Sequence, residues 1–388
     1  MNFTALDRYL DSLYLEKNIP GAGCSVILNG ETVHRHFSGY SDVERKIPFS
    51  GDTLVNLYSA TKISTVTAGM RLVEKGILSL DNPAAEYLPE LGRVTVRRDD
   101  GSAVPAKNTM LVRHLFSMSA GFTYDLTAGT WERIRSEGKD PDTRQVIRAL
   151  AQEPLAFEPG THFRYSFCHD VLAAVMEAAS GIPYPEILRR ELFAPLGMTD
   201  TGFTLNDEQR TRLAPEYHGF DGKTGKAREI VIREGVDMGM GKNYRSGGGG
   251  LISSVDDYSK LAAMLSRGGI STDGVRVLRE DTVDALRQNQ LNPEAMRDFE
   301  QMGGWSKMGY GYGLGVRTLM DPERNNSLSA KGEFGWDGAL GCYLLADPEN
   351  GVGIFYAQHE GGSPWWTWHG MIRNLAYAAV LGRENGVS

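Results

Sequence analysis

The sequence predicts an α+β fold in which strands from both ends of the chain form one antiparallel sheet, flanked by helices, with a large mainly helical segment inserted. Two strand–turn–strand patterns lie at opposite ends of the chain, in residues 23–37 and 341–358, and each is flanked by a helical pattern. Between roughly residues 55 and 290, apolar residues recur mainly at helical spacing. One sheet assembled from both ends is the economical arrangement of these elements.

The N-terminal elements are a helix and a hairpin, and two clear helices follow in the middle of the chain. Residues 4–17 have an amphipathic helical pattern, and Asn29-Gly30 lies between two strand-like runs, a strong signal for a tight hairpin turn. The stretch "HDVLAAVMEAASG" is helical and ends in a glycine stop, whereas "SSVDDYSKLAAMLSRGG" begins with a serine or aspartate cap.

The C-terminal elements repeat this plan in reverse. The stretch "GCYLLADPENGVGIFYAQ" predicts a hairpin with a longer turn at residues 347–351, and "WHGMIRNLAYAAVLG" predicts a closing helix. We therefore expect a sheet domain made of residues 1–55 and 300–388, and a mainly helical domain with the active-site loops in residues 56–299.

The composition is that of a globular protein with a large core. The 388 residues are 41% hydrophobic, and the net charge of −8 argues against a nucleic-acid partner, which needs clustered Lys and Arg. No apolar run approaches the ~20 residues that span a bilayer, so no membrane association is expected. The N-terminus has acids where a signal peptide needs a positive start, and three scattered cysteines form no disulfide framework. We expect a cytoplasmic protein; no pattern specifies an oligomeric state.

The stretch "LYSATKIS" places Ser59 three residues before Lys62, at the start of an apolar helical run. Residues three apart on a helix share a face, so a hydroxyl and an amine lie within mutual reach, as in a nucleophile beside its base. The alternative is a capping serine and a lysine whose stem packs on the surface. Ser136 and Lys139 have the same spacing in what we expect to be a charged surface turn, so spacing alone is weak.

Two further stretches add groups suited to acyl chemistry. Tyr165 and Ser166 follow a Pro-Gly turn and precede a helix; the tyrosine is either a core aromatic or a hydroxyl that relays a proton beside a lysine amine. The stretch "EFGWDGALGCYLL" leads into the second hairpin, and its glycines let the backbone approach another group closely. A strand edge there is able to aim an N–H group at a developing oxyanion.

We expect neither a cofactor nor a metal ion. The stretch "SGGGGL" at residues 246–251 is not followed by the Gly-Lys-Ser/Thr of a phosphate loop, and we expect it to line the pocket instead. The histidines and cysteines show no paired ligand spacing, so His162, Cys168 and His169 are expected to be structural. The absence of Gly-x-Ser-x-Gly argues against an α/β-hydrolase.

The order Ser-x-x-Lys, Tyr-Ser and Trp-x-Gly resembles the serine β-lactamase and penicillin-binding-protein superfamily. Further similar stretches are "LVEKGILSLDNPAAEYLPEL", "VRHLFSMSAGFTY", "PLGMTDTGF" and "YRSGGGGLISSVDDYSKLAAML". The resemblance covers about residues 5–382, is closest to class C β-lactamases and family-eight carboxylesterases, and implies the β-lactamase-like fold.

The resemblance also implies a role for each motif residue. Ser59 would attack the carbonyl, Lys62 would take its proton, and Tyr165 would pass a proton to the leaving group. The backbone N–H groups of Ser59 and Ala339 would form the oxyanion hole. The substrate-binding residues implied by this likeness are Trp336, Asp337, Gly338, Phe167 and Tyr124.

Two departures from the β-lactamase pattern favour the esterases. Phe167 stands where class C β-lactamases have an asparagine, and Trp336-Asp337-Gly338 stands where they have Lys-Thr-Gly. A lysine and a threonine would grip a β-lactam carboxylate, whereas an aspartate repels an anion. We therefore expect hydrolysis of short-chain carboxylic esters. The alternatives are a β-lactamase or D-amino-acid peptidase or amidase, an acyltransferase of the same fold, and a binding protein without turnover, which the intact Ser59, Lys62 and Tyr165 oppose.

Overall fold

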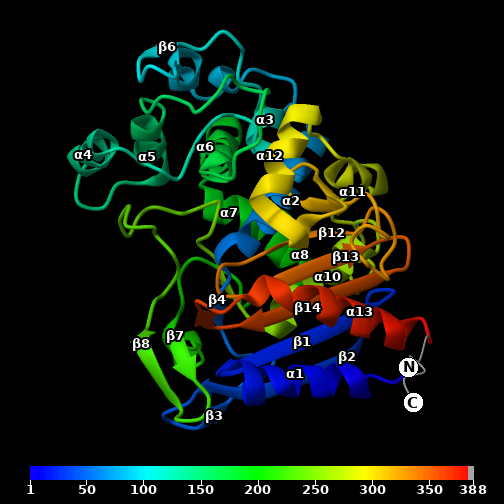
Figure 1. Ribbon diagram of the computed structural model, residues 1–388. Helices are drawn as coiled ribbons and strands as arrows, with labels where there is room; N and C mark the ends of the chain where they lie inside the picture. Colours follow the sequence, from blue (N-terminus) through cyan, green and yellow to red (C-terminus); the bar gives the residue numbers. More distant parts are fainter. Residues whose placement is uncertain (383–388) are drawn as a thin grey trace.

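The computed structural model describes residues 1–382, and its centre is an eight-stranded antiparallel sheet built from both ends of the chain (Figure 1). The strand order is β10-β11-β12-β13-β14-β1-β2-β3. The strands are β1 (Gly21–Leu28), β2 (Glu31–Asp42), β3 (Ile47–Pro48), β10 (Tyr310–Tyr312), β11 (Arg317–Leu319), β12 (Phe334–Asp337), β13 (Tyr343–Asp347) and β14 (Val352–Gln358). Strand β14 pairs with β1 along its length, which joins the two ends and confirms the predicted sheet.

Both predicted hairpins are present in the sheet. Asn29 and Gly30 connect β1 to β2 with φ values of 52° and 86°, the left-handed backbone that a tight two-residue turn requires. A longer turn joins β13 to β14 and ends at Gly351, whose φ is 64°. Turn chemistry visible in the sequence therefore sets these two registers.

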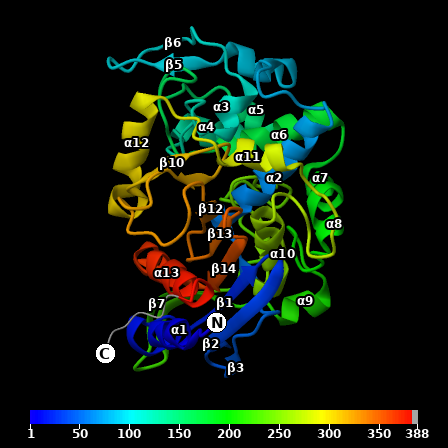
Figure 2. The same cartoon turned by 90° about the vertical axis from the view of Figure 1, so that its right-hand side faces the viewer.

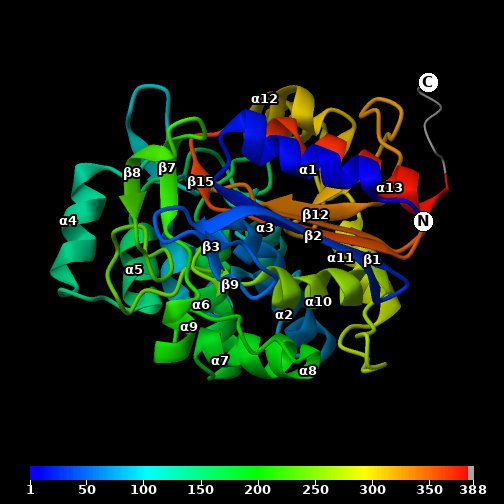
Figure 3. The ribbon, with the colours of Figure 1, turned by 90° about the horizontal axis from the view of Figure 1, so that it is seen from below.

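Helices cover both faces of the sheet (Figure 3). Helices α1 (Thr4–Lys17) and α13 (His369–Val380) lie side by side on one face, and α10 (Val255–Ser266) packs on the other face against β14 and β1. Successive strand residues point to opposite faces, so the apolar side chains of β13 and β14 alternate between the two resulting cores. The sheet is thus buried on both sides.

The segment between β3 and β10 carries most of the helices. They are α2 (Thr61–Glu74), α3 (Val112–Phe116), α4 (Ala128–Ser136), α5 (Thr143–Leu150), α6 (Cys168–Ser180), α7 (Tyr184–Leu188), α8 (Ala194–Leu196), α9 (Asp207–Thr211), α11 (Glu280–Arg287) and α12 (Pro293–Gly303), in addition to α10. The predicted glycine stop is Gly181, which ends α6 with a φ of 70°, and Ser254 caps α10 through its side chain. The inserted segment is therefore mainly helical, as predicted.

Short strands in and around this segment were not apparent from its helical periodicity. They are β4 (Val55–Asn56) with β9 (Ile252–Ser253), β5 (Thr95–Arg97) with β6 (Ala103–Pro105), and β7 (Glu216–Asp221) with β8 (Lys226–Val231) and β15 (Glu360–Gly361). Figure 2 shows β5 and β6 at the end of the helical part that is remote from β1 and β2. Most of these strands have two or three residues, too few for an alternating pattern to stand out.

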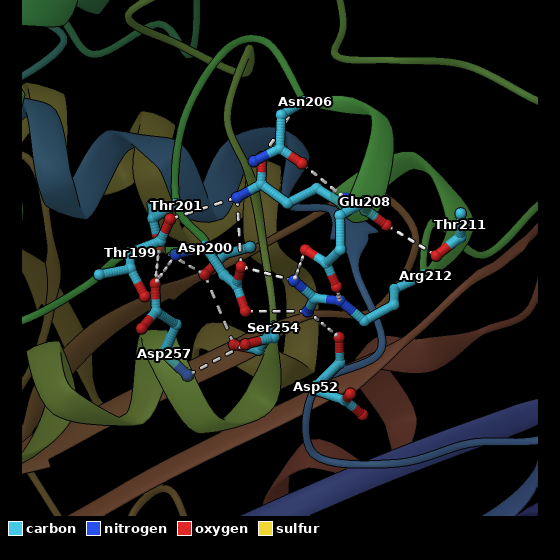
Figure 4. Close-up of polar contacts among 12 residues, drawn as sticks. Asp52, Thr199, Asp200, Thr201, Asn206, Glu208, Thr211, Arg212, Ser254 and Asp257 are labelled. Atoms are coloured by element: carbon cyan, nitrogen blue, oxygen red, sulfur yellow. Dashed lines mark hydrogen bonds and ion pairs between the residues drawn. The ribbon is translucent and has the colours of Figure 1, made fainter.

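A polar cluster around Arg212 holds the chain just before the first motif (Figure 4). The Arg212 guanidinium donates to both carboxylate oxygens of Asp200, at 2.9 and 2.8 Å, and to the Asp52 carbonyl at 2.8 Å. Asp257 of α10 accepts from the Asp200 backbone N–H and the Thr201 hydroxyl at 2.8 and 2.9 Å. The cluster thereby ties α10 and the α9 segment to the loop that enters β4.

The division into two domains stays a prediction, although the strands of the large sheet come from residues 21–48 and 310–358. Within residues 1–382, no helix combines the length and the apolar character that crossing a membrane requires.

Candidate active site

Ser59 lies in a strained turn between β4 and α2. This 3₁₀ turn, η1 (Tyr58–Ala60), precedes α2, so Ser59 stands just outside the helix whose second residue is Lys62. Tyr58 has a φ of 47°, a left-handed conformation that is costly for a bulky residue. The Tyr58 hydroxyl donates to the carboxylate of buried Glu216 at 3.0–3.1 Å, which holds the turn in place.

Lys62 is fully buried and its amine faces three oxygen atoms. Lys62 Nζ lies 3.1 Å from Ser59 Oγ, 3.3 Å from the Tyr124 hydroxyl and 2.6 Å from the Gly248 carbonyl. Among residues 1–382 no carboxylate oxygen lies within 4.0 Å of this nitrogen. The structure therefore brings the hydroxyl and the amine together without an ion pair.

Tyr165 contributes both its ring and its hydroxyl to the site. The ring centroid is 4.5 Å from Lys62 Nζ, and the ring stacks on Trp336 with centroids 5.5 Å apart. The Trp336 indole N–H donates to the Tyr165 hydroxyl at 3.1 Å. Besides Ser59, the hydroxyl within hydrogen-bond distance of the Lys62 amine is that of Tyr124 and not of Tyr165, an arrangement that the sequence motifs did not predict.

A buried acid lies behind Lys62. Asp170 accepts from Tyr244, Ser246 and the Gly248 N–H at 2.5, 2.6 and 3.4 Å, so it holds the loop whose carbonyl contacts Lys62. A Cβ at Gly248 would lie 2.6 Å from Asp170 Oδ2 and 3.3 Å from Lys62 Nζ, which explains a glycine there. Burial raises the pKa of Asp170, although the two hydroxyl donors and the charge of Lys62 oppose that change.

This loop was expected to line the pocket, but it supports Lys62 from behind. Asp170 was not among the predicted site residues, because its only signal was a carboxylate within an otherwise apolar helical run. His169, on the same helix, is buried against the Phe116 carbonyl, and burial lowers its pKa to about 3, in line with a structural histidine.

Ser59 opens onto a cavity of about 340 Å³, which we call the Ser59 cavity. Its walls are Ser59, Tyr165, Met302, Gly303, Ser306, Lys307, Trp336, Asp337, Gly338, Ala339, Trp365 and Trp366. Four of these residues are the predicted stretch 336–339, whereas the walls from 302–307 and the two C-terminal tryptophans carried no catalytic motif.

The predicted oxyanion donors border this cavity on adjacent segments. A Cβ at Gly338 would lie 2.2 Å from the Leu57 carbonyl, so the end of β12 passes directly against the chain entering η1. Within the described residues, neither the Ser59 nor the Ala339 backbone N–H donates to another group. Two amide donors beside one hydroxyl are the arrangement that stabilises charge on a carbonyl oxygen.

Two of the predicted substrate-binding residues lie elsewhere. Phe167 is 2% exposed and packs its ring on Tyr124, with centroids 4.6 Å apart. Neither residue is among the walls of the Ser59 cavity. Phe167 instead supports Tyr124, and Tyr124 contacts Lys62.

Asp337 does not present a free negative charge, so the expectation that it repels an anion is wrong. Its carboxylate pairs with Lys307 at 2.5 Å and with Arg317 at 3.1 Å, and His369 lies 3.7 Å away. Although burial opposes ionisation, the charges of Lys307 and Arg317 hold the pKa of Asp337 well below its usual value. Burial lowers the pKa of the Lys307 ammonium, against the effect of Asp337 beside it. No motif in the sequence had indicated either cation.

Within residues 1–382, no group of three or more His, Cys, Asp or Glu side chains is placed to hold a metal ion. The site around Ser59 consists of hydroxyls, one amine, backbone N–H groups and aromatic walls, which suit nucleophilic acyl chemistry.

Known proteins are similar to this chain over most of its length. Esterase EstB of Burkholderia gladioli is 31% identical over 90% of this chain and 88% of its own length, and lovastatin esterase of Penicillium rubens is 28% identical over 86% and 88%. The solved structure of "EstCE1, a hydrolase with promiscuous acyltransferase activity" matches with a TM-score of 0.78 at 27% identity, covering 97% of this chain and 98% of that one. The profile of the Beta-lactamase family matches residues 6–365. The chain belongs to the Beta-lactamase family.

Proposed function

We propose that this protein is a serine hydrolase that cleaves short-chain carboxylic esters through an acyl-serine intermediate. The observation that carries the proposal is the buried Lys62 amine 3.1 Å from Ser59 Oγ, at the wall of a cavity bordered by two backbone N–H donors. Similarity to the esterases EstB and lovastatin esterase supports the same reaction class.

The chemistry uses the geometry in two stages. Unprotonated Lys62 takes the hydroxyl proton while Ser59 Oγ attacks the ester carbonyl, and the N–H groups of Ser59 and Ala339 stabilise the oxyanion. Tyr165, whose hydroxyl accepts from Trp336, passes a proton to the departing alcohol. Deacylation runs these steps in reverse with water in place of the alcohol: Tyr165 takes a proton from the water that attacks the acyl carbon, and Lys62 returns a proton to Ser59 Oγ as the acid departs.

An alcohol is a second candidate to take the acyl group from the same acyl-enzyme, in place of water. The similar protein EstCE1 is a hydrolase with promiscuous acyltransferase activity, and Met302, Trp336, Trp365 and Trp366 line the cavity here with apolar surface. Apolar surface of this kind packs against the hydrocarbon part of an alcohol, a contact that water does not make. Product analysis with added alcohols separates transfer from hydrolysis.

Covalent labelling tests the nucleophile. A fluorophosphonate should modify Ser59, as located by mass spectrometry, and Ser59→Ala should abolish both labelling and hydrolysis of p-nitrophenyl butyrate. Ser136, which is also followed by a lysine at the third position, is the matched internal control. An adduct on Ser136, or none on a protein that turns over esters, would refute the assignment.

Nitrocefin in the same assay tests the β-lactamase alternative. Because Asp337 is neutralised, charge repulsion no longer argues against a β-lactam. A kcat/KM for nitrocefin above that for p-nitrophenyl butyrate would replace the ester assignment.

A small-molecule ester is the partner we propose. The cytoplasmic location and the lack of a nucleic-acid partner stay predictions. The free, buried thiols of Cys24, Cys168 and Cys342 are compatible with a reducing compartment.

A further inference from the structure

A second cavity of about 370 Å³ adjoins the Ser59 cavity and is lined by basic side chains. It lies between α13, η5 (Gly304–Lys307) and the loop that follows β11. We call it the Arg373 cavity, and the polar residues of its walls that matter here are Lys307, Arg317, Arg324, Asn325, Arg373 and Asn374. Ser306, Lys307, Asp337 and Trp366 line both cavities, so the two cavities share part of their walls.

Arg373 is a buried cation without a counter-ion among the described residues. It is 4% exposed, and its guanidinium donates only to neutral oxygens, of Tyr310 and Asn325 from Nη1 at 3.0 and 2.6 Å and of Asn374 from Nε at 3.1 Å. Within residues 1–382, no carboxylate oxygen lies within 4.0 Å of it, and Nη2 donates no hydrogen bond. A buried charge is costly unless it is paired, so an anionic ligand bound beside Arg373 would supply the counter-ion that the described residues do not.

The neighbouring Arg317 shows that the fold pairs a buried arginine where no ligand is needed. Arg317 is 2% exposed and lies 3.1 Å from Asp337 and 3.6 Å from Glu333. Lys307 also uses Asp337. Three cations, Lys307, Arg317 and Arg373, thus share two acids, and one positive charge is left over.

We propose that the Arg373 cavity binds a carboxylate of the substrate, so that the preferred ester carries a carboxylate group on its acyl or alcohol part. That this carboxylate lies beside an ester reacting at Ser59 rests on the proposed function. One uncompensated positive charge matches a singly charged carboxylate, whereas a phosphate monoester near neutral pH brings ~1.5–2 negative charges. The free Nη2 edge of Arg373 supplies the donors, and Asn325 and Asn374 hold that guanidinium in place.

Paired esters test the proposal. Mono-p-nitrophenyl adipate is compared with p-nitrophenyl hexanoate for the acyl side, and 4-acetoxybenzoate with its methyl ester for the alcohol side, after correction for spontaneous hydrolysis. We expect the carboxylate ester of at least one pair to have the higher kcat/KM. Because each ratio is measured on one preparation, partial unfolding of a variant cancels.

Two variants remove the site in different ways. Arg373→Gln removes the charge, and Gly370→Leu fills the cavity, since a Cβ at Gly370 meets only Arg373 Nη2, at an ordinary 3.9 Å. Each should lower the carboxylate-to-neutral ratio by about tenfold or more, the size of a charge-assisted hydrogen bond. Arg212 is a partly buried arginine outside both cavities. Arg212→Gln is therefore the matched control and should leave the ratio unchanged.

The outcomes separate this proposal from the proposed function. Hydrolysis of both esters with a ratio at or below one, or a ratio that both variants leave unchanged, overturns the carboxylate site alone. If no ester is hydrolysed, the proposed function fails, and thermal unfolding with sodium adipate against sodium chloride of equal ionic strength decides the site. Adipate should then raise the Tm of the wild type but not of Arg373→Gln; equal Tm values in both salts, or equal shifts in both proteins, overturn it.

Discussion

Two buried aspartates lie near the candidate site, one behind Lys62 and one in the wall of the Ser59 cavity, and their pKa values are shifted in opposite directions. Asp170, behind Lys62, is fully buried, and burial raises its pKa. Asp337, at the cavity wall, is 6% exposed, and the charges of two neighbouring cations hold its pKa well below the usual value in spite of burial. Similar burial therefore gives opposite shifts, because the partners decide which form is favoured.

The two aspartates belong to two different parts of the site. Asp170 lies beside the groups proposed to react, and Asp337 lies in a cavity wall that contains ion pairs. Two hydroxyl groups and a backbone N–H donate to one carboxylate oxygen of Asp170, and the Lys62 amine nearby hydrogen-bonds to hydroxyl and carbonyl oxygens. Lys307 and Arg317 surround Asp337. The groups proposed to react are thus held by hydroxyl and carbonyl oxygens, whereas the ion pairs lie in the wall of the cavity.

Removing Lys62 or Tyr165, the groups proposed to move protons, should have the largest effect on activity. Lys62→Ala and Tyr165→Phe should each lower kcat for p-nitrophenyl butyrate by about 10²–10⁴-fold, the usual worth of a positioned acid or base. Tyr124→Phe should cost less, because Tyr124 contacts Lys62 but does not line the Ser59 cavity. Steady-state kinetics check these values.

The double variant tests more sharply whether Lys62 and Tyr165 act together. Because the groups act as a unit, Lys62→Ala with Tyr165→Phe should be little worse than either change alone. Lys139→Ala, from the other Ser-x-x-Lys pair, should leave kcat unaltered. Fully multiplicative losses would show that Lys62 and Tyr165 act independently, and a larger loss in Tyr124→Phe than in Tyr165→Phe would exchange the roles of the two tyrosines.

Breaking the ion pairs on the Asp337 side should mainly affect stability. Arg317→Met leaves Asp337 with one cation fewer and removes the nearest cation of buried Glu333, so the free energy of unfolding should fall by ~3–5 kcal/mol. Urea unfolding followed by circular dichroism measures it. Adding Asp337→Asn should restore part of the loss, and an additive further loss would argue against a direct pair.

The pH dependence of stability should distinguish the two aspartates by sign. Asp337 has a lowered folded-state pKa, so its contribution is present above its unfolded pKa of ~3.9 and is lost as the pH falls towards the folded value. Asp170 has a raised folded-state pKa, so it costs stability as the pH rises from ~3.9 through the folded value.

Asparagine variants expose this contrast. Relative to wild type, Asp337→Asn should lose stability as the pH rises from acid values to ~3.9, whereas Asp170→Asn should gain relative stability above ~3.9. Thermal unfolding across the pH range measures both curves. If stability depended on pH in the same way in both variants, burial rather than the neighbouring groups would set the pKa of each carboxyl.

The Arg212 cluster gives the smallest expected effect. Arg212 and Asp200 are 20% and 24% exposed, so their paired hydrogen bonds compete with water. Arg212→Gln should lower the free energy of unfolding by only about 1 kcal/mol. A loss as large as that of Arg317→Met, in the same urea experiment, would show that burial is not what separates the two arginines.

Local elements of the fold could be predicted because their causes lie within a few residues. The helix over residues 4–17 follows from apolar spacing, and the β1–β2 turn follows from Asn29-Gly30, which adopts a left-handed backbone readily. The proximity of Ser59 and Lys62 belongs here too, since three residues of helical chain suffice to bring their side chains together.

The partners that give the site its character depended on the tertiary structure. The Gly248 carbonyl reaches Lys62 from 186 residues away, the Tyr124 hydroxyl from 62, and Lys307 meets Asp337 from 30. No periodicity or turn signal specifies such pairs, because they form only when separate elements pack. The sequence by itself determined which groups are able to react and where the local elements begin and end. Packing decided which of the charged groups are paired, and Arg373 was left without a counter-ion among the described residues because the two nearby acids were already shared by Lys307 and Arg317.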